Sequence, residues 1–163
     1  MPEPEAKGVV GTGAQGVDVE DPGDDGVMLH LALPRVQRVG SWLIGNVELT
    51  PTGGDLFTSI DRFRLPSPLS DQWDGHPLAG ASTEGLTLLQ GGTRVMAAQY
   101  ETPANYVPAM TLRFVASKEG GTILLGVVWP DTGQDTVTLD LPGNGKNNNS
   151  GLVARLTDIP VEG

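Results

Sequence analysis

Short runs of alternating apolar and polar residues, each ended by a glycine or proline turn, constrain this chain more than any other feature. Residues 110–115 read Met-Thr-Leu-Arg-Phe-Val, and residues 136–141 repeat the same two-residue period. Successive side chains of a β-strand point to opposite faces, so this period predicts strands with one buried face. No segment has a convincing 3.6-residue period, and 23 Gly and 13 Pro provide frequent turns.

Short apolar or alternating runs separated by turn residues recur through most of the chain. Residues 27–33 form an apolar run that ends at Pro34, and residues 35–39 and 41–50 flank Gly40 in the manner of a hairpin. Residues 93–101 are predicted to form one strand after a Gln90-Gly91-Gly92 turn. Residues 122–129 are continuously apolar, which predicts a central strand. About seven to nine strands, with turns roughly every 8–12 residues, are typical of an all-β sandwich or barrel, and we predict an antiparallel sandwich.

Charge divides the chain into two predicted parts. Residues 1–26 contain seven of the 20 acidic residues and a single lysine, among many glycines and prolines. This composition predicts a flexible acidic tail or linker, with one short strand at residues 16–20. Residues 27–163 are predicted to form the β-sandwich domain, a size that can bury a sufficient core without a metal or disulfide.

Composition excludes several functions. The formal net charge of −10 disfavours nucleic-acid binding, which needs clustered Lys and Arg. The absence of cysteine excludes disulfides and thiolate metal sites. No apolar run approaches the length of about 18 residues that a membrane-spanning helix needs. The first residues lack the basic and apolar regions of a signal peptide, which leaves a cytoplasmic chain or an excised domain as alternatives.

Residues 11–16 match the G-x-G-x-x-G pattern of dinucleotide-binding loops. That pattern needs a helix after the third glycine, so that the helix N-terminus faces the phosphates. Here the chain continues Val-Asp-Val-Glu-Asp-Pro, which cannot form that helix and adds negative charge. A linker in the acidic tail is therefore the preferred interpretation, and no cofactor is expected.

The best local candidate for a binding site lies in the long loop at residues 66–82. Asp71, Trp73, Asp74 and His76 place two carboxylates, an indole and an imidazole within six residues. Such a group could form a metal or sugar site, because Trp can stack on apolar faces, carboxylates can bind hydroxyls or cations, and loops often carry binding residues. The alternative is a turn anchored by its Trp. We predict this loop as the candidate interaction site.

Catalytic machinery is not apparent in the sequence. The chain has two histidines, His30 and His76, and nothing pairs either of them with a serine and a carboxylate as a catalytic triad would require. No cluster has the spacing of metal ligands. We therefore expect a protein that is not an enzyme and that has no catalytic residues, metal or cofactor.

The C-terminal half resembles a small Ig-like β-sandwich domain found in actinobacterial cell-envelope and secreted proteins. The resemblance rests on residues 85–89 before a glycine turn, residues 93–101, 121–130 and 135–142, and the ending at residues 156–161. Such domains often carry a cysteine pair, which this chain lacks. The resemblance implies an extracytoplasmic interaction or stabilising domain without a catalytic residue set.

Three functions follow as expectations. The first is a non-enzymatic binding or structural domain, outside the cytoplasm, with an unidentified protein partner at the 66–82 loop or at a sheet edge. The second is a phage virion or assembly component, such as a decoration or tail protein. The third is a carbohydrate-binding module that uses Trp42, Trp73 or Trp129, of which Trp129 is expected in the core.

Overall fold

Every regular element in the described part of the chain is a β-strand. The structure is a computed structural model that describes residues 2–20, 28–53, 86–101, 106–108, 110–117, 120–142 and 153–163. Its strands are β1 (Val9–Thr12), β2 (Val17–Glu20), β3 (Met28–Ala32), β4 (Val36–Val39), β5 (Trp42–Gly53), β6 (Thr87–Gln90), β7 (Thr93–Val95), β8 (Gln99–Glu101), β9 (Tyr106–Pro108), β10 (Met110–Ser117), β11 (Gly120–Pro130), β12 (Thr136–Pro142) and β13 (Val153–Glu162). The predicted all-β class is confirmed.

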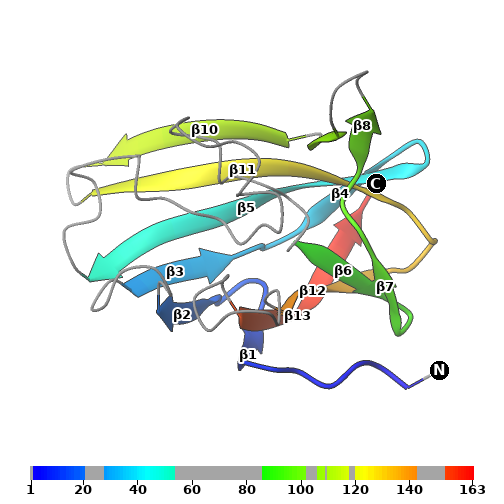
Figure 1. Cartoon of the computed structure of the whole chain (residues 1–163), viewed down its shortest axis with the longest axis horizontal. Coiled ribbons are helices and arrows are strands. Elements are labelled where there is room, and N and C mark those ends of the chain that lie inside the picture. Colours follow the sequence, from blue (N-terminus) through cyan, green and yellow to red (C-terminus); the bar gives the residue numbers. More distant parts are fainter. Residues whose placement is uncertain are drawn as a thin grey trace.

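One group of strands is built around β5. Strand β11 pairs antiparallel with one edge of β5, and β10 pairs with β11. The other edge of β5 pairs first with β4 and then, further along, with β3, which in turn pairs with β2. Figure 1 shows β10, β11, β5 and β3 side by side. The apolar run at residues 122–129 thus occupies a strand between two neighbours, as predicted.

The second group of strands is built around β13. It pairs antiparallel with β12 and parallel with β1, and β12 pairs with β6, which continues to β7. Gly91 and Gly92 join β6 to β7 with φ of 60° and 84°, the positive angles that a tight two-residue hairpin turn requires. The Gln90-Gly91-Gly92 turn is therefore confirmed. The single strand predicted for residues 93–101 is instead two, β7 and β8, because the backbone between them leaves β6 and Ala98 N–H donates to the Val128 carbonyl at 2.7 Å.

The two groups are connected through β13, which contains a β-bulge. Between the pairs Leu139–Leu156 and Val137–Ile159, β13 has one more residue than β12. Asp158 lies in this bulge with φ of 56°, a left-handed conformation that Asp tolerates better than most residues. Beyond the bulge, Val161 pairs parallel with Val36 of β4, so one strand hydrogen-bonds in both groups.

Both groups contribute to one core. Burial alternates along β5, where Leu43, Val47 and Leu49 are fully buried. Burial of these side chains is the main stabilising term, at about 25 cal/mol per Å² of apolar surface. The cluster contains Leu29, Leu31, Leu43, Val47, Leu49, Leu125, Val127 and Trp129 from the first group and Leu88, Val137, Leu139, Leu141, Ala154 and Leu156 from the second.

The N-terminal segment corrects a prediction. The sequence predicts a flexible tail over residues 1–26, with one strand at 16–20. Strand β2 confirms the predicted strand. Strand β1 is a second strand in this segment, and it pairs with β13 near the C-terminus. Val17 and Val19 are buried in the core, so this segment is not a tail over residues 9–20. The physical reason is that β2 alternates buried Val17 and Val19 with polar residues, whereas β1 forms by backbone pairing with the distant strand β13. Residues 21–27 lie outside the described residues.

Candidate functional site

The predicted interaction loop cannot be placed. Asp71, Trp73, Asp74 and His76, like the whole 66–82 loop, lie outside the described residues, so that site stays a prediction. Two other features of the described chain carry functional interest. One is a buried cluster of charged side chains, and the other is a group of exposed apolar side chains.

The charged cluster is centred on Asp140 of β12. Arg155 of β13 donates from Nε to Asp140 Oδ1 at 2.9 Å, and Arg94 Nη1 of β7 lies 2.7 Å from Asp140 Oδ2. The side chains of Asp140 and Arg155 are only 4% and 7% exposed. Asp140 therefore holds two guanidinium groups in a site largely removed from water, where ion pairs and hydrogen bonds are strongest.

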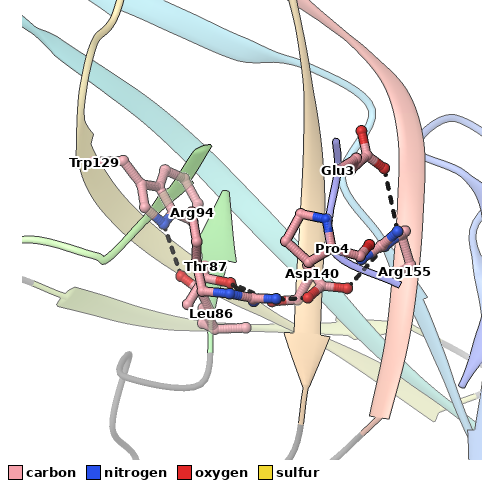
Figure 2. Close-up of polar contacts among 8 residues, drawn as sticks. All are labelled: Glu3, Pro4, Leu86, Thr87, Arg94, Trp129, Asp140 and Arg155. Atoms are coloured by element: carbon pink, nitrogen blue, oxygen red, sulfur yellow. Dashed lines mark hydrogen bonds and ion pairs between the residues drawn. The ribbon is translucent and has the colours of Figure 1, made fainter. Parts of the chain in front are cut away.

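Strand register explains why these groups meet. Asp140 lies opposite Thr87 on one side and opposite Arg155 on the other, and directly paired residues of a sheet share one face. Thr87 Oγ1 accepts a hydrogen bond from Arg94 Nη1 at 2.7 Å and donates to the Asp140 carbonyl at 2.8 Å. Three neighbouring strands thus supply one polar row, and β7 adds Arg94 (Figure 2).

Arg155 extends this cluster to the start of the chain. Its Nη1 donates to Glu3 Oε1 at 3.1 Å, and its Nη2 donates to the carbonyl of Pro4 at 2.7 Å. Figure 2 shows the Arg155 guanidinium between Glu3 and Asp140, with Pro4 beside it. We call Asp140, Arg155, Glu3 and Pro4 the N-terminal clasp. In it, the Arg155 guanidinium connects the β12–β13 strand pair to the extended N-terminal segment through ion pairs and hydrogen bonds.

A second ion pair fixes a turn at the end of β11. Arg38 Nε donates to Asp131 Oδ2 at 2.5 Å, and Gly133 N–H donates to Asp131 Oδ1 at 2.8 Å. The bond from Arg38 and then that from Gly133 lower the pKa of Asp131, and the Asp131 carboxylate in turn raises the pKa of Arg38. These contacts connect the β4–β5 hairpin to the turn that follows β11, which is a structural role.

The exposed apolar group lies on that hairpin. Val39, Trp42 and Ile44 are 50%, 44% and 39% exposed. Val39 is directly paired with Trp42, and Ile44 follows Trp42 by two residues, so the three side chains lie on one face of β4 and β5. Leu43 between them points into the core. We call Val39, Trp42 and Ile44 the hairpin patch.

Three other features noted in the sequence, Trp129, the G-x-G-x-x-G stretch and His30, make contacts within the fold. Trp129 is fully buried, as predicted, and its Nε1–H donates to the Leu86 carbonyl at 2.7 Å (Figure 2). The G-x-G-x-x-G stretch covers the end of β1 and the turn into β2, and it is followed by a strand and not by the helix that a dinucleotide-binding loop needs. His30 Nδ1 lies 2.9 Å from Asp18 Oδ1 on the surface, across the β2–β3 pair.

Within the described ranges, no three His, Asp or Glu side chains gather as metal ligands would. No helix able to cross a membrane occurs in the same part of the chain. Comparison with protein-family models, curated proteins and solved structures found no match to this sequence. The Ig-like type of sandwich and the actinobacterial resemblance therefore stay predictions from the sequence.

Proposed function

We propose that this chain is a non-enzymatic β-sandwich domain that binds a protein partner through the hairpin patch. The observation that carries the proposal is the exposure of Val39, Trp42 and Ile44 on one face of two paired strands. Single exposed apolar residues are normal, but an adjacent group that includes Trp is typical of an interaction surface. Trp is also among the residues that most often dominate binding energy at interfaces.

The surroundings of the hairpin patch favour a rigid binding face. The Arg38–Asp131 pair fixes β4 from its inner side, and Leu43 is fully buried beneath the patch. A binding surface that is already ordered loses little conformational entropy when a partner docks. The hairpin patch could therefore bind without rearrangement of the strands that carry it.

The charged cluster supports a structural role instead of a catalytic one. Asp140, Arg94 and Arg155 are engaged with one another, with Thr87 and with the N-terminal segment. Each described contact joins one part of the fold to another. The extracytoplasmic location belongs to the proposal as well, and it is supported by the sequence resemblance of the C-terminal half.

Paired surface variants test the proposed function. Trp42→Ser removes the centre of the hairpin patch, while Met96→Ser removes an apolar side chain of similar exposure, 50%, from the segment between β7 and β8. Tagged wild type and both variants are isolated from cells that express them, and co-isolated proteins are quantified. A partner lost about tenfold or more with Trp42→Ser but retained with Met96→Ser supports the proposal. Equal recovery of every protein by all three chains contradicts it.

A carbohydrate ligand is the second candidate. The exposed amides of Gln37 and Asn46 flank Trp42 and Ile44 on the same outer face, which gives an aromatic platform with hydrogen-bonding groups beside it. Glycan-array binding that is lost in Trp42→Ala would favour this candidate. Protein co-isolation that depends on Trp42, with no glycan bound, would favour the first.

A further inference from the structure

Strand β13 lies between the two groups of strands and is the only described strand that pairs in both. Residues 153–160 pair antiparallel with β12, and residues 154–157 also pair parallel with β1. Val161 and Glu162 then pair parallel with β4 of the other group. Figure 1 shows the red ribbon of β13 running toward β4, where the C-terminus lies. Through β13, two sets of strands become one continuous ladder.

Strand β13 also completes the buried interior. Leu156 and Ile159 are fully buried, and Ala154 is only 1% exposed. Arg155 supplies one of the two guanidinium partners of the buried Asp140 carboxylate. Without β13 in place, the apolar side chains that it covers would stay in contact with water, and Asp140 would lose this partner. The fold therefore depends on β13 for apolar burial as well as for strand pairing.

The partners of β13 come from opposite ends of the sequence. Ladders such as β4–β5 and β10–β11 join consecutive strands, so they can form as soon as those strands are present. The β1–β13 and β4–β13 ladders instead close loops that contain most of the chain, and closing such loops costs conformational entropy. The hydrogen bond from Trp129 to the Leu86 carbonyl also crosses between the groups, but it joins parts that must already lie together.

We propose that β13 is a closing strand: the two groups of strands do not combine into a folded domain until residues 153–163 occupy the position between β12 and β4. The β13 ladders and the buried residues of β13 carry this proposal. Because β13 is the last of the described strands to be synthesised, the chain stays open while its earlier strands emerge from the ribosome. Folding is thereby coupled to completion of the domain. The proposal does not depend on the hairpin patch or on its partner.

Full-length chains held on the ribosome through C-terminal linkers of two lengths test the closing strand. The short linker keeps residues 153–163 inside the exit tunnel, and the long linker places them outside. The matched control is a permuted chain in which residues 153–163 precede Met1 through a flexible linker long enough to run back along β13. With the same short linker, the permuted chain hides residues 142–152, of which only Pro142 belongs to a described strand. Resistance to limited proteolysis measures folding of each chain.

The native-order chain should be at least about fivefold more resistant with the long linker than with the short one, because proteolysis follows the population of open chains. The permuted chain should be resistant with both linkers, since its β13 has already emerged. Equal resistance of the native-order chain with the two linkers overturns the proposal. A permuted chain with the same dependence on linker length also overturns it, because the delay would then not come from β13. If the permuted chain is not resistant even after release, the native-order comparison alone decides.

Discussion

Asp140 and Arg155 face each other across β12 and β13, with the carboxylate Oδ1 2.9 Å from the guanidinium Nε. This pair occupies the outer face of its strands, yet both side chains are almost fully buried. A buried ion pair contributes little net stability by itself, but removal of one partner leaves a charge without compensation. Removal of either side chain should therefore destabilise the folded state, because the remaining partner keeps a buried charge without compensation.

Replacing Asp140 by Asn should destabilise the fold strongly. The change leaves Arg155 and Arg94 close together without their shared carboxylate, and breaking a buried pair in this way costs about 3–5 kcal/mol. Urea denaturation measures the free energy of unfolding. The matched control is Glu162→Gln on the same strand β13, whose exposed pair with Arg35 at 3.7 Å is worth less than about 1 kcal/mol. Equal effects of the two changes would contradict the role assigned to the cluster.

Trp129→Phe tests the hydrogen bond in the core. Phe fills most of the Trp volume but cannot donate to the Leu86 carbonyl, which is then buried without this partner. We expect a loss of about 1–3 kcal/mol in the free energy of unfolding. Trp42→Phe serves as the control, since its side chain is 44% exposed and the change should be nearly neutral. A neutral Trp129→Phe would show that the indole N–H is not needed.

Gly45→Ala should be destabilising although alanine is small. A Cβ at position 45 would lie 2.9 Å from Val36 Cγ1, 3.0 Å from Leu33 Cδ1 and 3.3 Å from the Trp129 ring. Overpacking of this kind costs about 1–3 kcal/mol. Gly40→Ala is a useful comparison, because nothing lies within 4 Å there and only its φ of 60° opposes the change. Thermal unfolding of both variants checks the expectation, and an unchanged Tm for Gly45→Ala would contradict the packing described.

The Arg38–Asp131 pair predicts an acid-sensitive contribution to stability. The folded-state pKa of Asp131 is lowered by its hydrogen bonds from Arg38 and Gly133. Its stabilising effect is therefore complete above the unfolded-state pKa of about 3.9 and is lost as the pH falls through the folded-state value. The difference in unfolding free energy between wild type and Asp131→Asn should shrink between pH 6 and about pH 2. A difference that does not change with pH would contradict this linkage.

The sequence predicted the strands whose alternation is regular and left others undetected. Strands β11 and β12 follow directly from the apolar run at 122–129 and the alternation at 136–141. Strand β1 has only Val9 and Val10 as apolar residues, and its parallel partner is at the other end of the chain. Local patterns carry no information about such distant pairing, so the N-terminal segment resembled a tail.

The candidate sites were harder to predict for a related reason. A charged residue in an alternating strand, such as Asp140, is normally solvent-exposed. Here Asp140 is buried because β6, β7, β13 and the N-terminal residues 2–12 are arranged around it. The hairpin patch was visible in part, since Trp42 was already a candidate. Its partners Val39 and Ile44 become significant only when the β4–β5 register places them on the same face as Trp42. The 66–82 loop stays a prediction.

Binding through the hairpin patch is tested most directly by a photo-crosslinking amino acid placed at position 42. The same probe at Thr132, which is exposed in the turn beyond β11, is the control. After irradiation of cells that express each chain, we expect one discrete protein adduct from position 42 and none above background from position 132. Equal adduct patterns from the two positions, or none from position 42, would contradict a protein-binding role for this surface.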